Sequence, residues 1–189
     1  MLENLVNPRV RLMEPKGDVI RNNLMGADNQ QERTETVGWV VGFVDGEGCF
    51  SVTLIRNSTT RTGWQVFPEF VVTQGQSSIS ALLFLKSWFG CGEVYVNRRS
   101  DNHREPLARY CVRALDALRT KVVPFFEKHP LKTKKREDFK KFAQVLEWMS
   151  EKKHLSKDGL REIAGVAQTM NRRKSARFLE SSETVRLTP

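Results

Sequence analysis

One carboxylate, Glu47, lies between two glycines, Gly46 and Gly48, three residues after the end of a nearly all-apolar run over residues 37–44. Such a run followed by a glycine-rich turn predicts a short helix over residues 37–46. The C-terminal end of a helix carries partial negative charge and exposed carbonyl oxygens, so it favours a cation. Glu47 and the carbonyl of Gly46 therefore predict half of an oxygen-rich site for a hard metal ion such as Mg²⁺.

Glycines recur every four residues in the same run. Gly38, Gly42 and Gly46 share one face of the predicted helix, and a face without side chains lets a second backbone come very close. The alternative interpretation is an ordinary buried helix that ends in a glycine cap.

The elements that must position Glu47 follow from hydrophobic periodicity. The order expected from residue 37 onward is α-β-β-α-β-β-α, followed by further helices. Residues 1–36 are polar and weakly patterned, which predicts an N-terminal extension that is partly disordered or packed on the core. Residues 172–189 read as a basic and polar tail, and no second copy of the acidic glycine motif follows. The predicted strands cover 49–56, 64–73, 93–98 and 107–113, and the later helices 77–89, 115–127, 135–152 and 157–170.

The predicted strands alternate in character, so each has a core side and an opposite side. Apolar residues of one parity, including Phe50, Phe70, Val94, Val96 and Tyr110, predict the core side. The opposite side is polar and basic with interleaved aromatic residues. On residue types alone, a solvated sheet surface is the ordinary interpretation of that side, and a surface that binds nucleic acid is the alternative.

The composition of the chain limits the class of molecule that it is expected to bind. The chain has 189 residues, a net charge of +9 and a pI near 9.7, which favours an anionic partner such as nucleic acid. No apolar stretch is long enough to span a bilayer, and the N-terminus lacks the apolar core of a secretory signal. The three cysteines show no metal or disulfide spacing. We expect an intracellular protein of the bacterial cytoplasm or an organelle matrix, without membrane contact.

The run from Val40 to Gly48 resembles the nine-residue signature of the LAGLIDADG homing endonucleases. Val40-Val41 replaces the usual Leu-Ala, and Glu47 stands where the final Asp is usual. The resemblance covers roughly residues 37–171. It implies an α+β fold with an αββαββα core, a saddle-shaped antiparallel sheet with helices on one face, and additional C-terminal helices.

The same resemblance implies an activity: a metal-dependent DNA endonuclease that makes double-strand breaks with 3′ overhangs in a long pseudo-palindromic target. Such enzymes promote the mobility of their host intron. Mg²⁺ is the expected metal, Mn²⁺ is the expected substitute, and Ca²⁺ is expected to support binding without cleavage. One motif per chain implies a homodimer, with an expected interface of Gly38, Val41, Gly42 and Asp45.

Further site residues follow from the resemblance. Gln74 matches the strand-end residue that orients active-site water, and Lys134 matches the lysine that stabilises charge near the scissile phosphate; Lys132 and Lys135 are neighbouring candidates. Without the resemblance, Gln74 is a surface residue and the lysines begin a solvated helix. The expected DNA-binding residues are Ser51, Thr53, Ile55, Asn57, Gln65, Phe67, Glu69, Tyr95, Asn97, Arg99, Arg109, Arg113, Lys132 and Lys135.

Two other functions remain open for the same fold. A maturase would bind its host intron RNA and would not need the metal site. A non-catalytic regulator would bind DNA without cleaving it. The basic tail around Arg172, Arg173, Lys174 and Arg177 adds phosphate contacts or is simply a solvated helix end.

Overall fold

The computed structural model describes residues 17–97 and 105–171, and the side chains of residues 30–96 and 105–171. The chain divides into two compact units, Met1–Val37 and Gly38–Pro189. Helix α1, Gly17–Glu47, begins in the first unit and ends in the second.

Helix α1 starts well before the predicted position at residue 37. Residues 30–35, just before the apolar run, are mostly good helix formers, and the helix extends through them. Local contacts support the helix: the Gln31 amide donates to the Glu35 carboxylate at 3.1 Å, and the Thr34 hydroxyl donates to the Gln30 carbonyl at 2.8 Å. Polar, exposed sequence is therefore compatible with a continuous helix here.

The second unit follows the predicted order of helices and strands, and the α+β expectation is confirmed. Strands β1 and β2 form a long hairpin, and β3 and β4 a shorter one. The elements after α1 are β1 Gly48–Arg56, β2 Trp64–Gly75, α2 Ile79–Phe89, β3 Glu93–Asn97, β4 Leu107–Val112, α3 Leu115–Ala117, α4 Val123–Lys128, α5 Lys135–Ser150 and α6 Lys157–Ala167.

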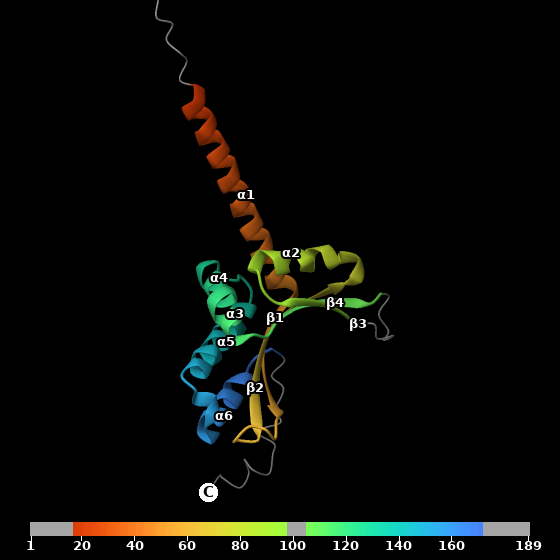
Figure 1. The fold of residues 1–189 in the computed structure, drawn as a ribbon, viewed down its shortest axis with the longest axis vertical. Helices are drawn as coiled ribbons and strands as arrows, with labels where there is room; N and C mark the ends of the chain where they lie inside the picture. Colours follow the sequence, from red (N-terminus) through yellow and green to blue (C-terminus); the bar gives the residue numbers. More distant parts are fainter. Residues whose placement is uncertain (1–16, 98–104, 172–189) are drawn as a thin grey trace, which may run out of the picture. The chain divides into compact units, whose positions relative to one another are not determined.

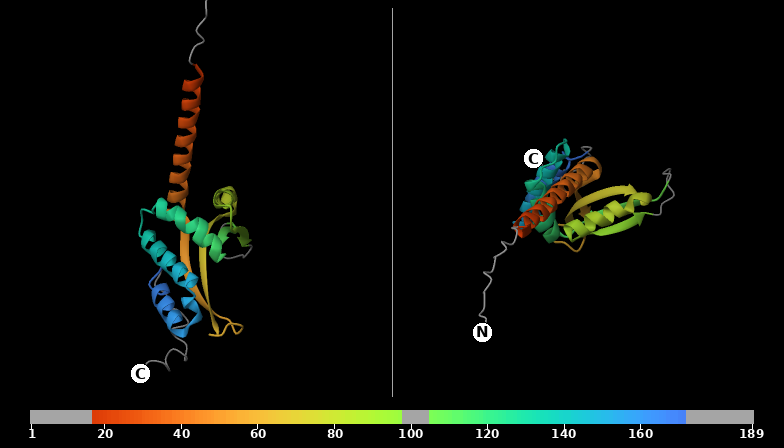
Figure 2. Two further views of the ribbon diagram at one scale, coloured as in Figure 1. Left: turned by 60° about the vertical axis from the view of Figure 1, so that its left-hand side comes forward. Right: turned by 90° about the horizontal axis from the view of Figure 1, so that it is seen from above.

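The four strands form one antiparallel sheet in the order β1-β2-β4-β3. Helices α5 and α6 lie along the β1–β2 hairpin, and α2 runs along β4 and β3 (Figures 1 and 2). The helices therefore cover one face of the sheet. Among the described residues, no helix is both long and apolar enough to cross a membrane.

The core lies between that covered face and the helices. Phe50 is fully buried and stacks on Phe70 with ring centroids 4.9 Å apart, and Phe126, Phe139 and Phe142 close around it. Alternate residues of β1 and β2 point into this core, as the two-residue period predicts.

The prediction for β3 is partly wrong. Val96 was placed on the core side, but its side chain is 37% exposed, and Val94 is only partly buried. Strand β3 is an edge strand of the sheet, so it has a neighbouring strand on one side only.

The predicted helix over 115–127 is interrupted. A π-helical turn at Leu118–Val122 separates α3 from α4. Pro124 lies in the first turn of α4 and has no N–H to donate to the preceding turn, which explains why the regular pattern breaks here. Ser78 occupies the cap position of α2, but its side chain makes no capping hydrogen bond. Instead, Ser77 donates its N–H and hydroxyl to the Glu105 carboxylate.

Candidate active site and nucleic-acid interface

Glu47 is the last residue of α1, and its side chain is exposed. Val40 and Val44 anchor the helix because they are fully buried in the core. Gly48 begins β1 and is buried; a Cβ at this position would overlap the side chain and carbonyl of Val44. The glycine after Glu47 is therefore required for the chain to turn directly from helix to strand.

The glycine face of α1 is open. Gly38, Gly42 and Gly46 are exposed, and a Cβ on any of them would meet no atom within 4 Å. Beside this face, the Trp39 ring is 45% exposed, stacks on Phe43 at 5.0 Å between ring centroids and meets Phe84 edge-on at 5.3 Å.

Asp45 holds the end of α1 to the turn before α5. Its carboxylate accepts hydrogen bonds from the N–H groups of Lys132 and Thr133, at 2.8 and 2.9 Å, and from the Thr133 hydroxyl at 2.6 Å. Burial opposes ionisation of this carboxyl, but these bonds and nearby Lys135 outweigh it and lower the pKa of Asp45. Asp45, which was predicted for a dimer interface, makes these contacts within its own chain.

Lys135, the first residue of α5, reaches across to the same helix end. Its ammonium donates to the carbonyl oxygens of Val44 at 2.9 Å and Gly46 at 3.1 Å. Burial lowers the pKa of Lys135, while the carboxylates of Asp45 and Glu47 and the neighbouring Cys49 favour its charged form. The carbonyl end of α1 therefore attracts a cation, as a helix C-terminus should.

The other two predicted catalytic residues are placed differently. Lys134 occupies the cap position of α5, and its side chain is exposed. Gln74 is half-buried near the end of β2. Val72 pairs with Gly48, the first residue of β1, so Gln74 lies two residues beyond the last pair between β1 and β2. This end of β2 is the one next to the end of α1.

Glu47 is a single carboxylate, and the described residues contain no cluster of three or more acidic, histidine or cysteine side chains suited to a metal ion. Glu47 at the negative end of α1, with the Gly46 carbonyl, fits a divalent cation as half of an oxygen site. These two groups alone do not complete the coordination shell of such an ion.

The uncovered face of the sheet carries most of the predicted DNA-binding residues. The register pairs Ser51 with Glu69, Thr53 with Phe67 and Ile55 with Gln65 across the first hairpin. At the hairpin tip, the Asn57 amide donates to the Gln65 amide oxygen at 2.8 Å, so these two predicted residues bind one another.

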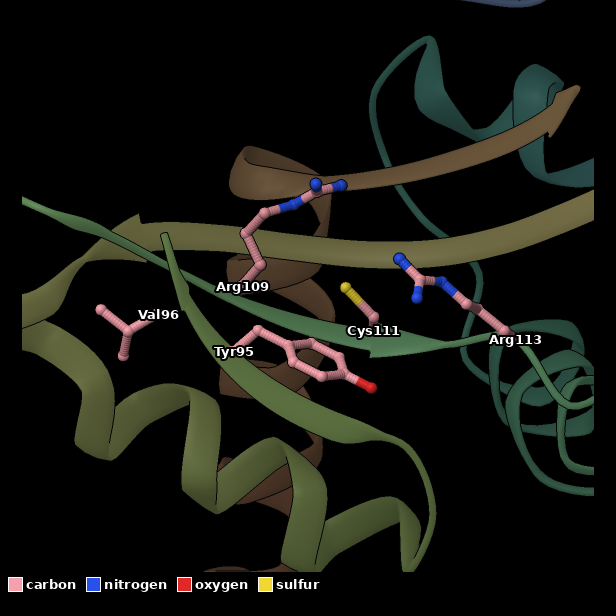
Figure 3. Close-up of a pocket in the computed structure, with 5 residues that line it drawn as sticks. All are labelled: Tyr95, Val96, Arg109, Cys111 and Arg113. Carbon is pink, nitrogen blue, oxygen red and sulfur yellow. The ribbon is translucent and has the colours of Figure 1, made fainter. Parts of the chain in front are cut away.

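Two arginines on this face converge on one carboxylate. Arg113 donates to Glu69 at 2.6 Å, and Arg109 lies 3.6 Å from the same side chain. The hydrogen bond to Glu69 raises the pKa of Arg113. With Tyr95, Val96 and Cys111 the arginines line a hollow of about 290 Å³ (Figure 3).

Some predicted residues fall outside this description. Asn97 ends β3 opposite Leu107, but its side chain lies outside the described residues. Arg99 and the tail residues Arg172, Arg173, Lys174 and Arg177 also lie outside them.

Sequence reasoning missed several contacts of this site. The hydrogen bonds of Asp45 with Lys132 and Thr133, here called the Asp45 clasp, join residues 87 and 88 positions apart. In the sequence, only the spacing between the motif and the lysine segment indicated that the two segments meet. Asn171 was also missed: its amide donates to the Phe50 carbonyl at 2.9 Å and its backbone N–H to Asp138, which ties the segment after α6 to β1.

The second unit thus combines a four-stranded antiparallel sheet, covered by helices on one face, with a helix that ends in an exposed carboxylate and leads directly into the first strand. The family profile described as LAGLIDADG endonuclease matches residues 40–146. The chain belongs to the LAGLIDADG endonuclease family.

Solved structures of relatives agree. The homing endonuclease I-TnaI is 45% identical, superposes with a TM-score of 0.69, and the match covers 79% of this chain and 97% of that one. I-SmaMI bound to uncleaved DNA in the presence of calcium ions is 34% identical with a TM-score of 0.67, covering 75% of this chain and 46% of that one.

A curated relative is the "Probable intron-encoded endonuclease 3" of Neurospora crassa, which is 29% identical over 135 residues, 70% of this chain. The chain spans only about a quarter to a third of the length of the first curated relatives that it matches.

Proposed function

We propose that this protein is a site-specific homing endonuclease that cuts both strands of a long, pseudo-palindromic DNA target and promotes the mobility of its host intron. One observation carries the proposal: α1 presents the exposed Glu47 carboxylate beside the Lys135 ammonium, at the edge of a sheet whose open face holds Arg109 and Arg113. Residues 37–171 form the proposed endonuclease domain.

Glu47 and the Gly46 carbonyl are the groups that would hold the metal ion, for which we propose Mg²⁺. Bound there, a divalent ion activates water and stabilises the charge that develops on the phosphate. The chain itself provides the negative helix end and, through the Asp45 clasp, a fixed position for the lysine opposite. Mn²⁺ is the expected substitute, and Ca²⁺ is expected to permit binding only.

Lys135 is our candidate for the charge-stabilising lysine, in place of Lys134. Its ammonium is already held within 3.1 Å of the carbonyl end of α1, next to Glu47. Lys134 points from the cap of α5 into solvent and suits a phosphate contact. Gln74, at the edge of the sheet near the end of α1, remains the candidate for orienting water.

The open sheet face is the proposed DNA-binding surface. Strand residues advance about 3.3 Å each, close to the spacing of base pairs, so alternate side chains can follow base edges in the major groove. The net charge of +9 supplies the attraction to phosphate.

A homodimer completes the proposed active site. Each chain offers one carboxylate, and the exposed glycine face of α1 has room for a second helix at close range. Two α1 helices packed through Gly38 and Gly42 would bring two Glu47 carboxylates together, and bound cations would offset their repulsion.

A selection from randomised duplex DNA tests the proposal. The full chain is incubated with the library in Mg²⁺ and, in parallel, with chelator. Enrichment of one pseudo-palindromic sequence cut on both strands only in Mg²⁺ is the expected result. Sequence-specific binding with no cleavage in Mg²⁺ or Mn²⁺ would instead support a DNA-binding regulator, and preference for intron RNA a maturase.

A further inference from the structure

Glu69 is the least exposed member of the charged cluster on the open sheet face. Its side chain is 13% exposed, whereas those of Arg109 and Arg113 are 43% and 46% exposed. The carboxylate therefore lies beneath the two arginines, and they, not Glu69, reach toward a bound ligand.

The arginines keep free donors while they contact Glu69. Arg113 uses its Nε, at 2.6 Å, which leaves both terminal amino groups available, and Arg109 approaches through one terminal nitrogen at 3.6 Å. A guanidinium has five N–H donors and binds the O6 and N7 of guanine through two of them. Both side chains can therefore bind a guanine without releasing the carboxylate.

Arg113 has a second restraint. Its guanidinium lies over the Phe67 ring at 5.5 Å and over the Tyr95 ring at 5.8 Å. Arg109 has no such aromatic contact among the described side chains, so its orientation depends more on Glu69. Figure 3 shows the two guanidinium groups pointing toward one another above Cys111.

The shared contact with Glu69 brings the two guanidinium groups closer together than their backbones are. The backbones of Arg109 and Arg113 are four residues apart. At the rise of a strand residue this is about 13 Å, which corresponds to about four base pairs. Their contacts with a single carboxylate bring the guanidinium groups within about 8 Å, or about two base pairs at 3.4 Å each.

We propose that Glu69 is a positioning residue that sets base specificity: it draws Arg109 and Arg113 together so that they read two guanines no more than about two base pairs apart. Glu69 itself does not accept a hydrogen bond from a base. The inference rests on the proposed function, and it makes that surface selective for closely spaced guanines in duplex DNA.

Charge gives Glu69 a second effect. The carboxylate reduces the net charge of the three side chains from +2 to +1 and occupies donors that would otherwise bind phosphate. Without it, the freed arginines gain phosphate contacts, which strengthens binding to unrelated DNA and steepens the salt dependence.

The test compares binding preferences in randomised duplex DNA with Ca²⁺, for the full wild-type chain and the variants Glu69→Gln, Arg109→Ala, Arg113→Ala and Glu93→Gln. Glu93→Gln is the matched control because it removes the same charge from β3, where Glu93 contacts Lys86 at 2.6 Å and, among the ion pairs of the described residues, contacts neither arginine. Each arginine variant identifies the base position that its arginine reads. Thermal unfolding is followed for every variant.

We expect the two positions to be guanines within two base pairs. Glu69→Gln should reduce the guanine preference about tenfold, more at the Arg109 position than at the Arg113 position, and should raise affinity for unrelated DNA. Glu93→Gln should keep the wild-type preference.

Two results would overturn the inference: wild-type guanine preference in a folded Glu69→Gln, or arginine positions four or more base pairs apart. The second uses only the wild type and the arginine variants, so it decides the matter even if Glu69→Gln fails to fold. Absence of any sequence preference in the wild-type chain would instead contradict the proposed function.

Discussion

At the scale of single residues, the candidate site depends on which lysine faces the end of α1. Resemblance selected Lys134, whereas the hydrogen bonds to Val44 and Gly46 come from Lys135. The two are adjacent in sequence, but the first turn of α5 directs them differently, and only Lys135 is partly buried.

Lys135→Met should therefore lower the rate of DNA cleavage by about 10²-fold, the usual cost of losing a charge-stabilising donor. Lys134→Met is the matched control, and it should stay within about threefold of the wild type because its ammonium does not lie against the helix end. Single-turnover cleavage of the selected site gives both values. The reverse order of effects would restore Lys134 to the active site.

Residue-scale prediction of structure from sequence succeeded where the information is local. The position of Glu47, at the end of a helix and directly before a strand, was predictable because the helix, the glycines and the strand are consecutive in sequence. The pairing of Glu69 with Arg113 joins residues 44 positions apart and depends on the register between β2 and β4, which no local pattern encodes. For the same reason, the sequence did not predict that Arg109 and Arg113, two expected DNA-binding residues, share one carboxylate.

At the scale of elements, strand positions were predictable because the two-residue period is strong, and every predicted strand is present within two residues at each end. The errors lie where context decides. Polar residues 17–36 continue α1, Pro124 interrupts a helix, and Val96 is exposed at the sheet edge.

Helix α6 contains two glycines in opposite environments. A Cβ on Gly159 would overlap the backbone carbonyl of Lys153, whereas one on Gly165 would meet no atom within 4 Å. Gly159→Ala should destabilise the fold by about 1–3 kcal/mol through overpacking. Gly165→Ala, the same change in the same helix, should stabilise it by up to about 1 kcal/mol. Denaturant unfolding measures both, and equal effects would refute this packing of α6 on the preceding turn.

The turn between α5 and α6 should also make stability depend on pH. Burial lowers the pKa of the His154 imidazole below its ordinary 6.5. The unfolded chain then binds more protons than the folded chain just below that pH, so the contribution of neutral His154 is complete above pH 6.5 and is lost as the pH falls.

His154→Gln removes this linkage. The fall in thermal midpoint between pH 7.5 and pH 5 should be smaller for this variant than for the wild type. An unchanged pH dependence would show that the imidazole titrates normally in the folded state.

At the scale of the whole molecule, the proposed active site needs two chains. A Cβ at Gly42 would meet no atom within 4 Å in its own chain, whereas a leucine side chain there would separate two helices packed through that face. Gly42→Leu should weaken dimerisation by about 2 kcal/mol or more, roughly thirtyfold, with little change in monomer unfolding. Gly165→Leu, also at an open helical glycine, should leave the dimer intact. Analytical ultracentrifugation distinguishes them, and a Gly42→Leu dimer of wild-type affinity would exclude this interface.

The most direct test of the account is cleavage of the selected site by the wild type and Glu47→Gln, with binding measured in Ca²⁺. The variant keeps the size of the side chain and removes only the charge at the end of α1. We predict that it binds the site with near wild-type affinity but cuts neither strand in Mg²⁺. Cleavage by Glu47→Gln at the wild-type rate would contradict the assignment of this helix end as the active site.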